Sequence, residues 1–261
     1  MPRKRFGQHF LESAWADKVV DAIEPSPDDR FLEIGPGTGV LTRRLAAKVR
    51  ELIAIEIDRD LATRLVADLP SNARVIVADV LETDLVSLTG GLPLRVAGNL
   101  PYNISSPILF SLLGAARRST NLRDATLMLQ LEVADRLLAK VGTADYGVLA
   151  ILTTLHADVT RLLTLPPGAF RPVPRVRSAV VRLSFRPPTV SIADEAAFER
   201  MVRSLFTRRR KTLLNAARPY AAAVGRDPAR ALAVAGIDPR RRPETLQVPE
   251  LARLAEAFVT G

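Results

Sequence analysis

The chain reads Arg30-Phe31-Leu32-Glu33-Ile34-Gly35-Pro36-Gly37-Thr38-Gly39, an apolar run that passes directly into a glycine-rich turn. The apolar run predicts a buried strand, and residues 40–49 after the turn have the apolar spacing of a helix. Glycines at such a turn let a ligand approach the backbone closely, and the start of the helix leaves N–H groups unpaired. The dinucleotide-binding pattern is absent, because position 40 is Val40 rather than Gly or Ala. The stretch therefore predicts a cradle for a small ligand.

Strands and helices alternate on both sides of this turn. Further strands are predicted at 52–58, 73–78, 94–97 and 125–130, and helices at 12–23, 60–69, 107–116, 132–140 and 148–157. A last strand, 175–185, alternates in character and is expected to be antiparallel. This order implies a doubly wound, mainly parallel sheet with its ligand site along the carboxyl edge.

Acidic residues stand where two of the predicted strands end. Glu56 lies 21 residues after Gly35, the distance at which nucleoside-binding α/β folds present a carboxylate to ribose hydroxyls. Asp79 follows the next strand, in a position to accept a hydrogen bond from an adenine amine. Either residue alone is also typical of a solvated helix cap. Together with the glycine turn, they predict a nucleoside ligand.

The fourth predicted strand runs into Gly98-Asn99-Leu100-Pro101-Tyr102-Asn103. The Asn99 amide both donates and accepts hydrogen bonds, and the Tyr102 ring offers a face for stacking. Our hypothesis is that this segment holds an adenine base while its exocyclic amine is modified. The alternative is a plain strand-to-helix turn, because Asn, Pro and Gly are common turn residues.

The last third of the chain is richer in proline and arginine. Phe170 lies in a proline-rich loop, 166–174, where it either stacks on a flipped base or anchors the loop by hydrophobic contact. Pro187-Pro188 marks a linker, so we predict domains at 1–186 and 187–261, the second one helical. A helix predicted over 196–217 carries Arg208, Arg209, Arg210 and Lys211, either as a phosphate clamp or as a solvated face.

Positive charge is concentrated at the two ends of the 261-residue chain. The net charge is +9, of which residues 1–11 contribute +3, residues 187–261 contribute +5 and the remainder +1. The pattern indicates a near-neutral catalytic body between segments that bind a polyanion. A coding bias towards arginine is the alternative explanation.

Composition narrows the remaining chemistry. The chain has no cysteine and two histidines, which excludes thiolate chemistry and a histidine-rich metal site, so we expect no metal. No apolar run approaches the length of a membrane span, and the basic opening is not followed by the apolar core of a signal peptide. We therefore expect a cytoplasmic protein without membrane contact.

Six ordered motifs resemble one family, the small-subunit ribosomal RNA adenine N6,N6-dimethyltransferases. They cover residues 3–11, 33–39, 55–60, 99–105, 170–180 and 209–215, which include Gly-Gln-His-Phe-Leu, Asn-Leu-Pro-Tyr and Arg-Arg-Lys-Thr-Leu-Leu-Asn. The resemblance implies a Rossmann-like S-adenosylmethionine (SAM)-dependent methyltransferase with a small C-terminal all-α domain. The commonest family form has Asn where this chain has His9.

The resemblance also implies roles for individual residues. SAM contacts fall on His9, Leu11, Gly35, Gly37, Glu56, Asp79 and Asn99. Catalytic positioning of the base falls on Asn99, Leu100, Pro101, Tyr102 and Phe170. RNA binding is expected of the basic segments at the two ends of the chain, Arg3, Lys4, Arg5, Arg208, Arg209, Arg210 and Lys211.

The implied reaction is dimethylation of N6 on two adjacent adenosines near the 3′ end of 16S rRNA. The implied partner is the small ribosomal subunit or its 30S precursor, with a role in subunit biogenesis. Because nothing in the sequence demands more than one copy, we expect a monomer. Two alternatives stay open: a resistance-type methyltransferase that modifies 23S rRNA, and a mainly non-catalytic ribosome-assembly factor. Leu100 and the Arg-Arg-Lys-Thr-Leu-Leu-Asn motif favour the small-subunit branch.

Overall fold

The structure is a computed structural model that describes residues 9–260, with the side chain of residue 260 left out of the description. Contacts divide the chain into two compact units. The described part of the first comprises residues 9–134 and 157–187, and that of the second comprises residues 135–156 and 188–260.

This division differs from the predicted domains in the segment 135–156, which the sequence assigned to the first domain, and by one residue at the boundary, because Pro187 belongs to the first unit. The segment packs with the second unit instead. Its Tyr146 ring meets the edge of Phe206 at 6.0 Å between centroids, and its His156 Nε2 lies 2.9 Å from Glu195 Oε2. The strand–helix alternation that suggested the assignment describes chain order, whereas these contacts determine the packing.

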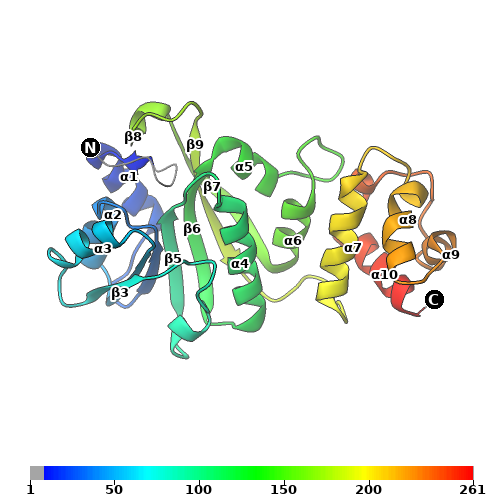
Figure 1. Cartoon of the computed structure of the whole chain (residues 1–261), viewed down its shortest axis with the longest axis horizontal. Helices are drawn as coiled ribbons and strands as arrows, with labels where there is room; N and C mark the ends of the chain where they lie inside the picture. Colours follow the sequence, from blue (N-terminus) through cyan, green and yellow to red (C-terminus); the bar gives the residue numbers. More distant parts are fainter. Residues whose placement is uncertain (1–8, 261) are drawn as a thin grey trace. The chain divides into compact units, whose positions relative to one another are not determined.

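The first unit is built on a seven-stranded sheet with the order β4-β3-β2-β5-β6-β9-β7 (Figure 1). Its strands are β2 Arg30–Ile34, β3 Glu51–Glu56, β4 Ala73–Val77, β5 Leu94–Asn99, β6 Leu122–Gln130, β7 Ala157–Leu165 and β9 Ser178–Phe185. Strands β2 to β6 pair in parallel, whereas β9 is antiparallel to both β6 and β7. The predicted parallel sheet with an antiparallel last strand is confirmed. The prediction lacked β7, and β9 begins three residues later than expected.

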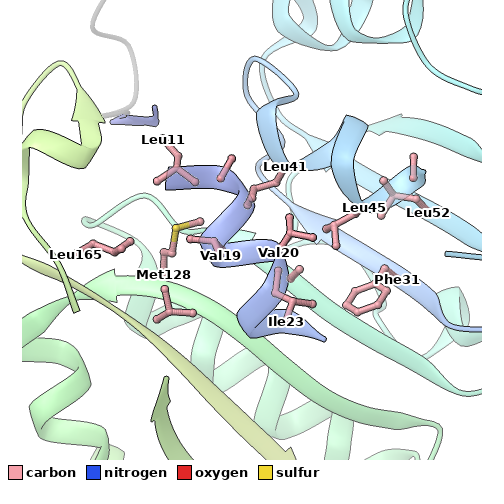
Figure 2. Close-up of a cluster of buried hydrophobic side chains, with 14 of the residues drawn as sticks. Leu11, Val19, Val20, Ile23, Phe31, Leu41, Leu45, Leu52, Met128 and Leu165 are labelled. Carbon is pink, nitrogen blue, oxygen red and sulfur yellow. The ribbon is translucent and has the colours of Figure 1, made fainter. Parts of the chain in front are cut away.

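Helices precede, join or follow the parallel strands. They are α1 Ser13–Ile23, α2 Val40–Ala46, α3 Arg59–Val66, α4 Ser105–Arg118 and α5 Leu131–Leu137, with short 3-10 turns at Ser87–Thr89 and Pro167–Ala169. Helix α1 buries Val19, Val20 and Ile23, which belong to the same hydrophobic cluster as Phe31 and Leu45 (Figure 2). Because these residues recur at helical spacing, the apolar stripe of α1 packs on the sheet.

A two-residue strand, β1 Phe10–Leu11, pairs antiparallel with β8 Phe170–Arg171. Leu11 lies opposite Phe170, and the Glu12 N–H donates to the Ala169 carbonyl at 2.8 Å. The start of the described chain is thereby joined to the loop that precedes β9.

The second unit is helical. Its elements are α6 Val148–His156, α7 Glu195–Thr207, α8 Leu213–Ala223, α9 Pro228–Val234, a 3-10 turn Pro243–Thr245 and α10 Val248–Thr260. The single helix predicted over 196–217 is wrong: α7 ends at Thr207 and α8 starts at Leu213. The intervening segment turns because Thr212 adopts an extended backbone conformation, with ψ 151°, and Leu213 N–H donates to Arg241 O at 2.6 Å.

None of the helices in the described part of the chain is both long and apolar enough to cross a bilayer.

Candidate active site

A cavity of about 280 Å³ lies in the first unit, where β2, β3, β4 and β5 end. Its wall includes His9 and Phe10, the turn glycines Gly35 and Gly37, Glu56 and Ile57, Asp79 and Leu81, and Asn99, Leu100, Pro101, Tyr102 and Asn103. Parallel strands place their carboxyl ends at one edge of a sheet, which is why residues so far apart in sequence meet here.

The glycine turn after β2 brings the backbone to the cavity wall. Gly35 and Gly37 have φ values of +67° and +58°, in the left-handed region that side-chain-bearing residues rarely adopt. A Cβ atom at Gly37 would lie 2.9 Å from the Phe10 ring. Glycine at this position therefore gives both the required backbone conformation and the space for the β1 segment.

Glu56 ends β3 with both carboxylate oxygens held in place. Oε2 accepts from the Gly37 N–H and Oε1 from the Asp58 N–H, each at 3.0 Å. The residue is 3% exposed, and burial raises the pKa of its carboxyl, while those two backbone N–H groups partly offset the rise. An oxygen atom that accepts one hydrogen bond keeps a second lone pair, so this carboxylate is fixed and still able to accept from a ligand hydroxyl.

Asp79 follows β4 and is half-buried in the cavity wall. Its Oδ1 accepts from the Leu81 N–H at 2.9 Å, which fixes the carboxylate at the start of the next turn. The helix-cap alternative and the ligand alternative both fit this bond, because the other oxygen is left for a ligand amine. Leu81 and Ile57 add exposed aliphatic surface beside the two carboxylates, at 39% and 45% exposure.

The sequence reasoning missed those two aliphatic residues. Each stands within two positions of a strand-end carboxylate, and a flat purine ring needs an apolar wall as well as polar contacts. The sequence signal that could have identified them is an aliphatic residue close to an acidic one at the end of a predicted parallel strand.

Asn99, at the end of β5, has a defined amide orientation. Its Nδ2 donates to the backbone carbonyl of His9 at 2.7 Å. Because a carbonyl oxygen only accepts, the amide nitrogen must face His9, which leaves Oδ1 as the acceptor on the other side. Among residues 9–260, no donor reaches the carbonyl oxygen of Leu100, the next residue. Two adjacent acceptors thus stand at the cavity wall.

Tyr102 is fixed at both its hydroxyl and its ring. The hydroxyl lies 2.6 Å from Ser178 Oγ, and the ring stacks on His9 at 5.2 Å between centroids and 28° between planes. Burial raises the pKa of the Tyr102 hydroxyl, so the side chain stays neutral near pH 7. His9 Nδ1 lies 2.6 Å from the Pro172 carbonyl, which means that Nδ1 carries the proton.

Two predicted site residues do not line the cavity. Leu11 and Phe170 are buried in the hydrophobic cluster behind it, at 6% and 0% exposure. Phe170 pairs with Leu11 in the small sheet, so its ring is covered by β1 rather than presented to a base. The hydrophobic-anchor interpretation of Phe170 describes this position, and the stacking interpretation does not match it.

The structure describes four of the seven predicted RNA-binding residues, and all four belong to the second unit. Arg3, Lys4 and Arg5 lie outside the described residues. Arg208, Arg209, Arg210 and Lys211 form the turn between α7 and α8 in the second unit, where Arg209 pairs with Glu244 at 3.3 Å. In the part of the chain that the structure describes, no cluster of His, Asp or Glu is arranged to hold a metal ion.

A parallel sheet in this strand order, extended by the antiparallel pairing of β9 with β6 and β7 and with a nucleoside-sized cavity at its carboxyl edge, defines a Rossmann-like SAM-dependent methyltransferase. The residues fit that cofactor: the Gly35–Gly37 backbone leaves room for it, and Glu56 and Asp79 offer acceptors. The chain belongs to the ribosomal RNA adenine dimethylase family, whose sequence model matches residues 2–256. Members of this family are enzymes that use SAM to dimethylate adenine in ribosomal RNA.

Individual relatives cover almost the whole chain. Ribosomal RNA small subunit methyltransferase A of Geobacter metallireducens is 45% identical over 267 residues, which cover 98% of this chain and 95% of that protein. The protein of the same name from Chromobacterium violaceum is 44% identical over 258 residues, with coverage of 98% and 95%.

Two solved structures are similar along the whole chain. A dimethyladenosine transferase from Plasmodium falciparum has a TM-score of 0.75 at 25% identity, covering 94% of this chain and 96% of its own. The 23S rRNA methyltransferase ErmE has a TM-score of 0.68 at 29% identity, covering 96% of this chain and all of its own.

Proposed function

We propose that this enzyme dimethylates N6 of two adjacent adenosines near the 3′ end of 16S rRNA, within the small ribosomal subunit or its 30S precursor. The observation that carries the proposal is the orientation of Asn99, whose amide nitrogen is bonded to His9 O and whose oxygen is left as an acceptor. The names of the relatives, at 44–45% identity over nearly the whole chain, support the choice of the small subunit.

The chemical task is to make a poor nucleophile reactive. The lone pair of adenine N6 is delocalised into the ring, and it becomes available when the amine moves towards tetrahedral geometry. Asn99 Oδ1 and the Leu100 carbonyl accept the two N6 hydrogens and favour that geometry. The bound cofactor supplies an electrophilic methyl group on sulfur.

Positioning accounts for most of the catalysis in this proposal. Tyr102, fixed by Ser178 and His9, stacks on the flipped base, a contact worth about 1–3 kcal/mol. Holding the amine in line with the methyl group replaces a bimolecular encounter with an oriented one. No side-chain base is needed, because the proton on N6 leaves after methyl transfer.

The resistance-type activity on 23S rRNA is a second candidate, because the chain is similar to ErmE over its full length. The relatives with the highest identity named above are small-subunit enzymes, and they favour the 16S target. A mainly structural role in ribosome assembly is compatible with either reaction.

RNA binding is proposed for the basic segments Arg3–Arg5 and Arg208–Lys211, whose charges suit a polyanion. We also propose a monomer that acts in the cytoplasm, where its substrate particle is assembled.

The test is methyl transfer from labelled SAM to three substrates: unmethylated small subunits, large subunits and naked 16S rRNA. We expect label in small subunits, mapped to adjacent adenosines near the 3′ end. Label in large subunits alone would instead support the 23S activity. Binding of small subunits without any transfer would support the assembly role.

A further inference from the structure

The segment Arg171–Arg177, which we name the arginine–valine loop, joins β8 to β9 with an unusual surface. Its Val173 and Val176 side chains are 54% and 43% exposed, and Arg171, Arg175 and Arg177 are exposed between them. About half of each valine faces solvent, and two such apolar side chains within one loop, beside three cations, form a surface suited to contact with another molecule.

The backbone of the loop is held firmly beside the cavity. The Pro172 carbonyl accepts from His9 Nδ1, and the Arg177 carbonyl accepts from the Leu131 N–H at 3.0 Å. Directly after the loop, the Ser178 hydroxyl bonds Tyr102. His9 and Tyr102 both line the cavity, so the loop stands at its rim and presents side chains from a fixed frame.

Most of the charge on the loop is not neutralised within the protein. The side chains of Arg175 and Arg177 make no hydrogen bond or ion pair with another of the residues 9–260. The Arg171 Nε atom lies 3.3 Å from Glu12 Oε1, yet the Arg171 side chain is 61% exposed. Elsewhere in the same unit, Arg95 is 11% exposed and pairs with two aspartates.

We propose that the arginine–valine loop is an RNA-binding edge that holds the strand on either side of the target adenosine. The inference rests on the proposed function, because a base that enters the cavity leaves its own phosphates at the rim. Arg175 and Arg177 bind those phosphates. Val173 and Val176 pack against the neighbouring bases and sugars that lose their stacking partner when the target base flips out.

The first test replaces both unpaired cations, in the double variant Arg175→Gln/Arg177→Gln. Its affinity for unmethylated small subunits and for a 16S rRNA fragment is measured over a range of salt concentrations. We expect binding roughly ten-fold weaker at moderate salt, and a log–log salt slope smaller by about 1 for each phosphate that the variant no longer binds. SAM affinity, measured by calorimetry, is expected to stay unchanged.

The matched control is Arg50→Gln. Arg50 is exposed, makes no hydrogen bond or ion pair through its side chain with other described residues, and lies just before β3, at the opposite edge of the sheet from the cavity. We expect this variant to bind RNA and SAM as the wild type does. An equal loss of RNA affinity in the control would show that the lower net positive charge of the protein, and not the position of Arg175 and Arg177, weakens binding. That result would overturn the proposal.

A second variant, Val173→Ser/Val176→Ser, tests the apolar contact. We expect weaker binding of the fragment with an unchanged salt slope, and recovery in Val173→Ile/Val176→Ile. Exposed valines are replaced without loss of core packing, so unchanged SAM affinity shows that the fold is intact.

Three results would overturn the proposal. One is wild-type affinity and salt slope in the double arginine variant. Another is loss of particle binding with normal binding of the naked fragment, which would identify a protein contact instead. The third is wild-type binding by the serine variant. Because binding is measured without catalysis, these results are independent of whether wild-type enzyme methylates small subunits, the outcome on which the proposed function depends.

Discussion

Replacing Glu33 by glutamine should remove a large pH dependence of stability. Glu33 lies in β2 at 1% exposure, and its Oε2 has no hydrogen-bond partner among the described residues. Burial raises the pKa of its carboxyl from 4.5 to about 7; the nearby Thr42 hydroxyl opposes part of the rise, and the Glu56 carboxylate adds to it. The side chain therefore keeps a proton in the folded protein at a pH where the unfolded chain has lost it.

The direction and size follow from proton linkage. Between about pH 4.5 and pH 7 the folded state binds more protons at this residue than the unfolded state, so the free energy of unfolding falls as pH rises. A shift of that size corresponds to about 3 kcal/mol across the window. Glu33→Gln has no such proton, and we expect it to match the wild type near pH 4 and to be more stable by up to that amount at pH 8.

The assay is urea unfolding at several pH values, followed by the fluorescence of Trp15. This is the only tryptophan in the chain, and it lies in α1, in the same unit as Glu33. Its fluorescence therefore reports on the unfolding of the first unit. Glu82→Gln, at an exposed position, is the control and should follow the wild-type curve. Parallel curves for wild type and Glu33→Gln would refute the reasoning.

Three further changes test the cavity wall. Glu56→Gln replaces one acceptor oxygen by an NH₂ donor that faces a backbone N–H. Because a charge-assisted hydrogen bond is lost, we expect SAM binding, measured by calorimetry, to weaken about 10- to 100-fold. Wild-type affinity would exclude a role for Glu56 in SAM binding. Gly37→Ala places a Cβ 2.9 Å from the Phe10 ring at a backbone φ of +58°. We therefore expect the free energy of unfolding to fall by about 1–3 kcal/mol and SAM binding to weaken. Unchanged stability and affinity would show that the turn adapts to the side chain. Tyr102→Ala should raise the KM for small subunits about 10- to 100-fold by removing a base stack, with Tyr102→Phe much milder because it keeps the ring; equal effects would assign the role to the hydroxyl.

Much of the site could be predicted because it depends on chain topology. An apolar strand followed by a glycine turn fixes one strand end, and the parallel alternation places Glu56, Asp79 and Asn99 at the same edge. Those residues line one cavity in the structure. Their individual contacts with SAM and adenine remain predictions, tested by the variants above.

Other features depend on packing that a sequence pattern does not encode. Strand β7 begins directly after His156, with no Gly or Pro to separate it from the apolar helix before it. The turn at Arg208–Thr212 could not be predicted from the apolar pattern, because Leu205 and Leu213 on either side of it keep a helical spacing. Phe170 is a core residue because β1 pairs with β8, a contact between segments about 160 residues apart.

The central claim is that Asn99 positions adenosine N6 of 16S rRNA for methyl transfer. The most direct measurement is mass spectrometry of nuclease fragments from unmethylated small subunits, incubated with SAM and either wild type, Asn99→Ala or the control Asn121→Ala. Asn121 directly precedes β6, at the amino ends of the parallel strands, whereas the cavity lies at their carboxyl ends. We expect the wild type and the control to place two methyl groups on each of two adjacent adenosines near the 3′ end. Asn99→Ala should still bind SAM and transfer methyl groups at least about 100-fold more slowly. Transfer by Asn99→Ala at the wild-type rate, or methyl groups at another position, would contradict the claim.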